Sequence, residues 1–90
     1  MKSLPEILEG IEDGLETFVR LSNGSCFGLV DFEMIDESIY QRSDLCVADI
    51  VSKIEVDHDV YRIGNKLEFS VDDVVELKDV ASGNVLYQKL

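Results

Sequence analysis

The sequence predicts a mainly β protein, a small open barrel of about five strands that begins with a short helix. The first indication is the pair Asn23-Gly24, which lies between two runs rich in β-branched and aromatic residues. Such a pair between such runs is the strongest short-range signal of a hairpin. Two later turn signals, Gly64-Asn65 and Ser82-Gly83-Asn84, separate further runs of the same kind. Gly28 lies inside a predicted strand, where a glycine favours the sharp bend that curls a small sheet.

Length and composition indicate one globular domain over residues 1–90. A chain of 90 residues is too short for a second domain, and its 46% hydrophobic content is ordinary for a folded protein. The N-terminal stretch has no apolar run like that of a signal peptide, and no segment approaches the roughly 18 apolar residues of a membrane span. The two cysteines do not make a disulfide scaffold. We therefore expect a cytoplasmic protein without membrane association.

Residues 1–14 are predicted to form the N-terminal helix, and residues 15–90 the barrel. Ser3 and Glu6 have the spacing of a capping box, and Pro5 lies in the first turn, where its missing N–H costs nothing. Gly14 is the predicted end of the helix. The apolar face has helical spacing and consists of Leu4, Ile7, Leu8, Ile11 and Leu15.

The first hairpin has a predicted register. A two-residue loop at Asn23-Gly24 would place Leu21 opposite Cys26 and Val19 opposite Gly28. Opposed residues share one face of the sheet, so one face becomes the predicted core. This core face consists of Leu15, Thr17, Val19, Leu21, Cys26, Gly28, Val30, Phe32 and Met34. The apolar residues of the other face are Phe18, Phe27 and Leu29. They lie either beneath the N-terminal helix or in an exposed patch that marks a partner surface.

Residues 44–54 allow two interpretations. As a helix, Cys46, Val47, Ile50, Val51 and Ile54 would form one stripe, which would make the protein an α+β domain. As a strand, Cys46, Ala48 and Ile50 would share a face, and the valine and isoleucine content favours this interpretation. We predict the strand and keep the helix as the alternative.

The C-terminal half contains the remaining predicted strands. Residues 60–63 and 66–70 are expected to be extended on either side of a turn at Gly64-Asn65, after an exposed turn at Asp57-His58-Asp59. Ser70-Val71-Asp72-Asp73 fits one capped helical turn. Residues 74–80 and 85–88 are predicted to pair through a two-residue Ser82-Gly83 loop, which would place Glu76 opposite Lys89.

No motif of catalysis, metal binding or cofactor binding is present. His58 is the single histidine, and no nucleophile-elbow pattern accompanies it. Cys26 and Cys46 lie far apart without a CxxC pair, and both fall on apolar faces, where free cysteine behaves as a small hydrophobe. The chain has no glycine-rich phosphate loop. We expect a protein that is not an enzyme and that uses no cofactor or metal.

The order of elements resembles a known fold. A short N-terminal helix, the pattern V-x-L-x-N-G at residues 19–24, the strand glycine Gly28 and the later pair Asp73-Val74 are together similar to the Sm-like fold, an SH3-like small barrel. Residues 67–74 are also similar to the closing strands of the acidic Rho-binding antiterminator family, whose members dock on a basic partner protein. The chain departs from the Sm pattern at Asp31-Phe32, where Phe-Asp is usual, and it has no basic RNA-binding loop.

Charge decides between the function classes that remain. The formal net charge is −11, and the 8 basic residues are scattered, whereas phosphate binding needs clustered cations. We therefore expect a protein-interaction module (an adaptor, inhibitor or immunity-type protein) that binds a basic protein and self-associates, rather than one that binds nucleic acid. The alternatives are a nucleic-acid-binding Sm-like barrel and a small-molecule-binding barrel. The candidate partner-binding residues are Glu6, Glu9, Glu12, Asp13, Glu16, Phe18, Phe27 and Leu29. A second acidic cluster, Asp31, Glu33, Asp36 and Glu37, is expected to lie near the first.

Overall fold

The computed structural model describes residues 3–35, 44–55 and 62–89, with the side chains of residues 54 and 55 excepted. Expectations for residues 36–43 and 56–61, including Asp36, Glu37 and Asp57-His58-Asp59, lie outside the described residues. The elements in order are α1 (Leu4–Glu9), β1 (Thr17–Leu21), β2 (Cys26–Met34), β3 (Leu45–Glu55), β4 (Lys66–Ser70), a 3₁₀ helix (Val71–Asp73), β5 (Val74–Asp79) and β6 (Val85–Gln88).

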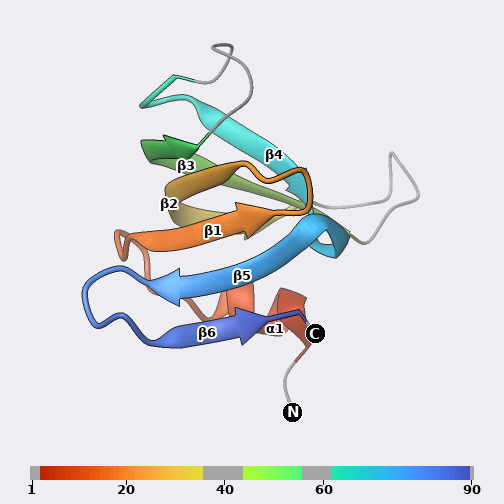
Figure 1. Cartoon of the computed structure of the whole chain (residues 1–90). Helices are drawn as coiled ribbons and strands as arrows, with labels where there is room; N and C mark the ends of the chain where they lie inside the picture. Colours follow the sequence, from red (N-terminus) through yellow and green to blue (C-terminus); the bar gives the residue numbers. More distant parts are fainter. Residues whose placement is uncertain (1–2, 36–43, 56–61, 90) are drawn as a thin grey trace.

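The described strands form one antiparallel sheet of six strands in the order β4-β3-β2-β1-β5-β6. The sheet curls around a core but does not close, so β4 and β6 are its two edges (Figure 1). The predicted fold class, a mainly β small open barrel with a short N-terminal helix, is confirmed. The sixth strand is the short C-terminal β6.

Residues 45–55 are a strand, so the alternative of an α+β domain is wrong. Cys46, Ala48 and Ile50 alternate with less buried residues and are each at most 1% exposed. This period of two is that of a strand with one face in the core. The helical stripe required Val47 and Val51 to be buried as well. Val51 is instead exposed.

The predicted register of the first hairpin is wrong by one residue. Val19 lies opposite Phe27, and Phe18 lies opposite Gly28. The loop has three residues, because the Gly24 N–H donates to the Leu21 carbonyl (2.9 Å) and the Leu21 N–H donates to the Ser25 carbonyl (2.9 Å). Among the loop residues only Gly24 takes a positive φ, of 91°. A two-residue type I′ loop needs a positive φ at both positions.

The shifted register exchanges the two faces of β2, because successive side chains of a strand point to opposite sides. Phe27 and Leu29 are 1% and 0% exposed and lie in the core. Gly28 and Val30, which were predicted to be core residues, lie between these positions and face outward. Val30 is accordingly only half-buried. On β1 the prediction is confirmed, since Thr17, Val19 and Leu21 are buried.

A bulge in β2 then reverses the alternation. Asp31 has a φ of 59°, and the pairing of β2 with β3 shifts between Val30 and Glu33. Beyond the bulge, Phe32 and Met34 pack against the core as predicted, and the rings of Phe32 and Phe69 meet edge to face at 6.4 Å between centroids. An extra residue in one strand is the usual way to re-aim the side chains that follow it.

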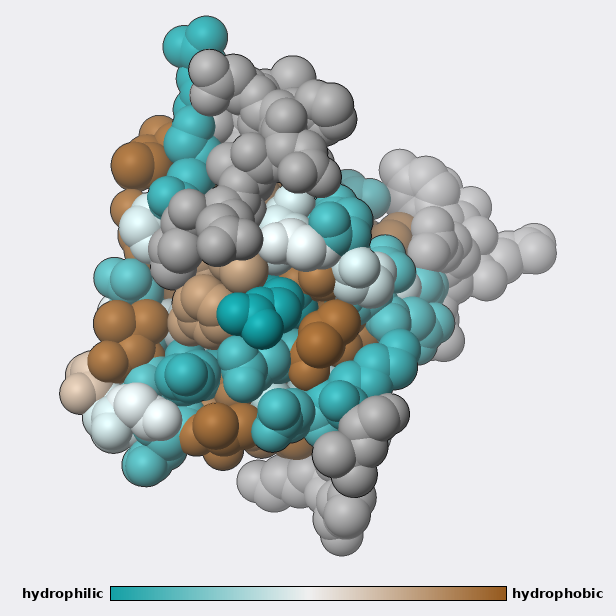
Figure 2. Space-filling model, viewed as in Figure 1, coloured by the Kyte–Doolittle hydropathy of each residue, from teal (hydrophilic) through white to brown (hydrophobic). Residues whose placement is uncertain are grey.

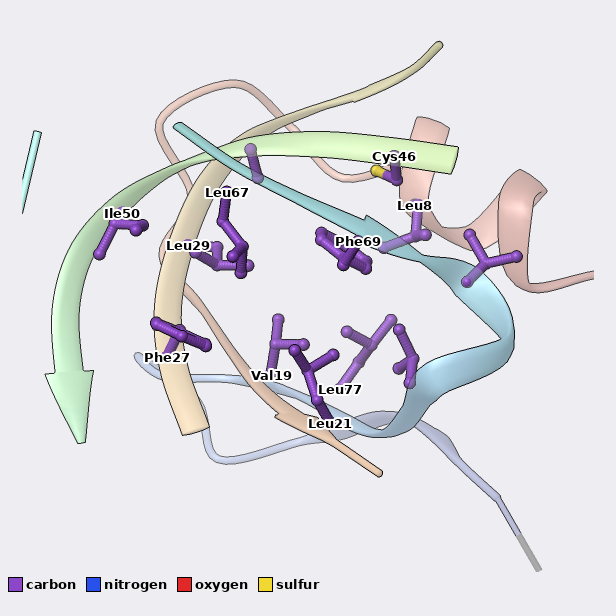
Figure 3. Packing of buried hydrophobic residues seen from close by; sticks show 13 residues of the cluster. Leu8, Val19, Leu21, Phe27, Leu29, Cys46, Ile50, Leu67, Phe69 and Leu77 are labelled. Atoms are coloured by element: carbon purple, nitrogen blue, oxygen red, sulfur yellow. The ribbon is translucent and has the colours of Figure 1, made fainter. Parts of the chain in front are cut away.

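The core is enclosed by the curved β2 and β3 and by β1, β4 and β5 (Figure 3). Val19, Leu29, Leu67 and Leu77 point toward one another in its middle. Leu8 from α1, 0% exposed, reaches the core beside Phe69 and Cys46. The helix ends at Glu9, so the predicted span 1–14 is too long. The capping box of Ser3 and Glu6 is confirmed.

The C-terminal half follows the predicted order of elements with two corrections. Residues 62–65 form a turn, so Ile63 is not in a strand. In the last hairpin Glu76 faces Gln88 rather than Lys89. The turn is longer than two residues, because the Gly83 N–H donates to the Asp79 carbonyl and the Asp79 N–H to the Asn84 carbonyl, both at 2.8 Å. The capped turn is confirmed as the 3₁₀ helix, whose Asp72 N–H donates to Ser70 Oγ at 3.2 Å.

Candidate acidic interface

The helix presents its charged residues to solvent because its apolar residues are held against the sheet. Leu4, Ile7 and Ile11 pack on the core around the buried Leu8, which leaves Glu6 and Glu9 exposed. Glu6 is used by the cap: Ser3 Oγ donates to its carboxylate at 3.0 Å, and the Glu6 N–H donates back to Ser3 Oγ at 3.4 Å. Glu9 has no such capping role in the helix.

A hydrogen bond joins the two acidic segments. The Gly14 N–H donates to Asp31 Oδ1 at 2.8 Å, across 17 positions of sequence. Both residues have a positive φ, 82° at Gly14 and 59° at Asp31. Aspartate is among the few non-glycine residues that accept this conformation readily. The bond holds the loop that carries Glu12 and Asp13 against the bulge of β2.

Cys46 shows that the segments also meet at a second point. Burial, together with the nearby carboxylates of Glu33 and Glu9, raises the pKa of the Cys46 thiol to about 11, against the opposing effect of backbone hydrogen bonds. One carboxylate comes from β2 and the other from α1, so both lie close to the same buried sulfur. With such a pKa the thiol is protonated at neutral pH and behaves as a small apolar group.

These contacts define an acidic surface, the name used below for five exposed carboxylates on α1, the following loop and β2: Glu9, Glu12, Asp13, Asp31 and Glu33. Within the described residues, no lysine or arginine forms an ion pair with any of them. Elsewhere, Lys66 Nζ lies 3.2 Å from Asp49 Oδ1. The acidic surface therefore keeps its charge uncompensated within the described part of the chain.

Glu16 does not join this surface. Its carboxylate lies beside Ser52 Oγ over Gly28, where a Cβ on residue 28 would come within 2.8 Å of Glu16 Oε2. Gly28 thus allows a close approach on the outer face of β2, and the β2–β3 pairing shifts next to it. This agrees with the expected role of Gly28 at an irregular point of the sheet.

Of the two alternatives for Phe18, Phe27 and Leu29, the exposed apolar patch is wrong, because Phe27 and Leu29 lie in the core rather than on the surface. Phe18 alone is on the outer face, half-buried, between two cations. Arg20 and Lys78 lie 5.7 and 5.8 Å from the centre of its ring. Cations above an aromatic face are attracted by it, by about 0.5–1 kcal/mol at an exposed site. Figure 2 shows the face over β1, β5 and β6 as small apolar areas separated by hydrophilic ones.

The described residues offer little for other chemistry. They contain no group of three or more His, Cys, Asp or Glu side chains placed to hold a metal ion. No ligand-sized pocket opens on the described surface. Neither helix in the described ranges is long and apolar enough to cross a membrane.

Sequence reasoning brought the two acidic clusters near each other but missed the bond that joins them. The available signal was the spacing of apolar residues in β2, at 27 and 29 and then at 32 and 34. That change of parity requires a bulge between them, and an aspartate in the gap is a suitable residue for a positive φ.

Comparison of the chain with protein-family models, curated proteins and solved structures finds no match.

Proposed function

We propose that this chain is a non-enzymatic protein-interaction module whose acidic surface binds a basic protein. The observation that supports this most is the Gly14–Asp31 bond, which gathers carboxylates from two separate segments that form no ion pair with a cation of the described residues. Gathering like charges raises the free energy of the folded protein, and solubility needs no such concentration of charge. A basic partner would relieve that repulsion on binding.

The proposal predicts how association depends on charge. A field of one sign steers a partner of the opposite sign, so association is fast and is slowed by salt. If the partner were instead held by short-range packing, substitutions in the interface would change mainly the dissociation rate. The resemblance to the acidic antiterminator family supports the same class of partner.

The test is to isolate partners from the native host and measure association rates at low and physiological ionic strength. We expect Glu9→Lys with Glu12→Lys to slow association by about tenfold or more, within the range of electrostatic steering. Circular dichroism should show the variant folded, because both side chains are exposed.

A matched pair of single variants separates local from total charge. Glu12→Lys changes the acidic surface, and Asp72→Lys makes the same change in net charge on the 3₁₀ helix, where Asp72 is also exposed. The proposal expects the first to slow association more than the second. A partner whose association rate ignores salt and both substitutions would show that the acidic surface is only a solvated face.

A further inference from the structure

The open sheet has two edges with different surroundings. β4 forms one edge and β6 the other, and Figure 1 shows them at opposite ends of the sheet with α1 beside β6. An edge strand presents unpaired backbone groups that accept another strand. Which groups are free follows from the pairing with the inner neighbour.

On β4 the outward backbone groups belong to Lys66, Glu68 and the terminal Ser70, and the two charged residues are the ones that matter for pairing. The Ile50 N–H donates to the Asn65 carbonyl at 2.9 Å, and the Val71 N–H donates to the Asp44 carbonyl at 2.7 Å. Hydrogen-bonded and non-hydrogen-bonded pairs alternate along an antiparallel ladder, so Leu67 and Phe69 also bond to β3. The N–H and C=O of Lys66 and Glu68 therefore point away from β3, to the free edge.

The side chains of the same two residues carry opposite charges. Lys66 and Glu68 are both exposed and lie on the outer face, because Leu67 and Phe69 on either side are buried. The Lys66 ammonium is held over this face by Asp49, and its side chain stays 67% exposed. A second ion pair can therefore form on its free side.

We propose that β4 pairs antiparallel with β4 of a second copy of this chain, about a two-fold axis at Leu67. This register places Lys66 opposite Glu68 of the partner copy twice, because a two-fold contact repeats itself. A shift of two residues would instead oppose Glu68 to Glu68 or Lys66 to Lys66. A shift of one residue would leave the outward hydrogen-bonding groups unmatched. The charges thus select one register, which joins backbone groups and opposite charges together.

The other edge is unsuitable for the same contact. α1 packs against β6 and carries Glu9 of the acidic surface. Pairing β6 with β6 would bring two acidic surfaces together, whereas pairing β4 with β4 leaves α1 at the far end of each copy. The proposed dimer would display two acidic surfaces and could bind a partner with two basic sites through both. This self-pairing does not depend on the proposed function.

The first test places proline at matched positions of the two edges. Glu68→Pro removes an outward N–H from β4 without removing a bond to β3, and an edge strand tolerates such a proline. Gln88→Pro does the same on β6, because the Leu77–Tyr87 pair and the Lys89 N–H bond to Val75 leave Gln88 facing outward. Analytical ultracentrifugation from micromolar to millimolar concentration should show a dimer for the unmodified chain and for Gln88→Pro. Glu68→Pro should raise the dissociation constant by about tenfold or more. A monomer at every concentration, or a loss of the dimer only in Gln88→Pro, would overturn the proposal.

The second test exchanges the charges. Lys66→Glu and Glu68→Lys should each weaken the dimer, because each opposes like charges across the two-fold axis. The double variant Lys66→Glu with Glu68→Lys restores opposite charges at both places and should dimerise more tightly than either single variant. Circular dichroism checks that all three fold. A double variant no tighter than the singles would overturn the register.

Discussion

At the scale of the residue, Asp31 connects the fold to the acidic surface. It is the only non-glycine residue in the described chain with a positive φ. Its backbone makes the bulge of β2, and its carboxylate accepts the Gly14 N–H from the loop after α1. One residue therefore both redirects a strand, through its backbone, and holds two acidic segments together, through its side chain.

We predict that Asp31→Ala destabilises the fold more than Asp31→Asn. Alanine loses the hydrogen bond to Gly14 and is strained at a φ of 59°, whereas asparagine keeps an acceptor and tolerates that conformation. Alanine should cost about 1–3 kcal/mol of unfolding free energy and asparagine about half of that or less. Urea unfolding gives both values. Equal costs for the two variants would mean that neither the bond nor the backbone conformation matters there.

The buried thiol of Cys46 gives a prediction for alkaline pH. Its pKa is about 11 in the folded protein, against about 8.5 in an unfolded chain. Between these values the folded state binds more protons than the unfolded state, so stability falls as pH rises through this window. The total effect is on the order of 3 kcal/mol, because each unit of pKa shift corresponds to about 1.4 kcal/mol. Cys46→Ala should flatten the decline measured by urea unfolding between about pH 8.5 and 11, relative to the unmodified chain. Parallel curves for the two proteins would refute the assignment.

At the scale of the element, β2 decides how the barrel is filled. Its first half turns Phe27 and Leu29 inward, and its second half, after the bulge, turns Phe32 and Met34 inward. Gly28 lets Ser52 and Glu16 approach the outer side of the same strand. Because of these successive bends, β2 can pair with β1 in the hairpin and also with β3 over a longer stretch.

The register of β2 can be tested with two neighbouring residues. We predict that Leu29→Ala costs about 2–5 kcal/mol of unfolding free energy, because Leu29 is fully buried in the core. Val30→Ala should cost much less, since Val30 faces outward and is only half-buried. Thermal or urea unfolding of the two variants provides the comparison. A greater loss at Val30 would instead support the register with a two-residue loop.

At the scale of the whole molecule, a net charge of −11 opposes the hydrophobic packing of a small core. The acidic surface lies on α1, the loop after it and β2, whereas the proposed dimer contact lies on β4. The negative charge is therefore distributed unevenly between the two proposed contact surfaces. Repulsion that is not balanced by nearby cations is weakened by salt, whose screening length is roughly 10 Å at 0.1 M.

We therefore predict that the melting temperature rises when sodium chloride is added from low to physiological ionic strength. Glu12→Lys should raise the melting temperature at low salt and reduce its salt dependence, because it places a cation among uncompensated carboxylates. Asp72→Lys makes the same change in net charge on the 3₁₀ helix, outside the five residues of the acidic surface, so it is the matched control and should change both the melting temperature and its salt dependence less. Differential scanning calorimetry measures all three proteins. A melting temperature that falls with salt would show that attraction, not repulsion, dominates the surface charge.

The class of the fold and most of its elements could be predicted from the amino-acid sequence. The capping box at Ser3 and the turns at Gly24, Gly64 and Gly83 could be predicted from it, and the valine and isoleucine content of residues 44–54 favoured the strand over the alternative helix. Each depends on the propensity or the backbone freedom of a few adjacent residues, so the information lies in one short segment.

The register of the hairpins and the composition of the acidic surface emerge only in the folded chain. The burial of Phe27 and Leu29 depends on whether Asn23 takes a positive φ, and a shift of one residue exchanges the faces of a strand. The meeting of the two acidic segments depends on a bond between Gly14 and Asp31, which lie on different elements. Pairing, bulges and long-range hydrogen bonds are properties of two segments at once, and neither segment contains them alone.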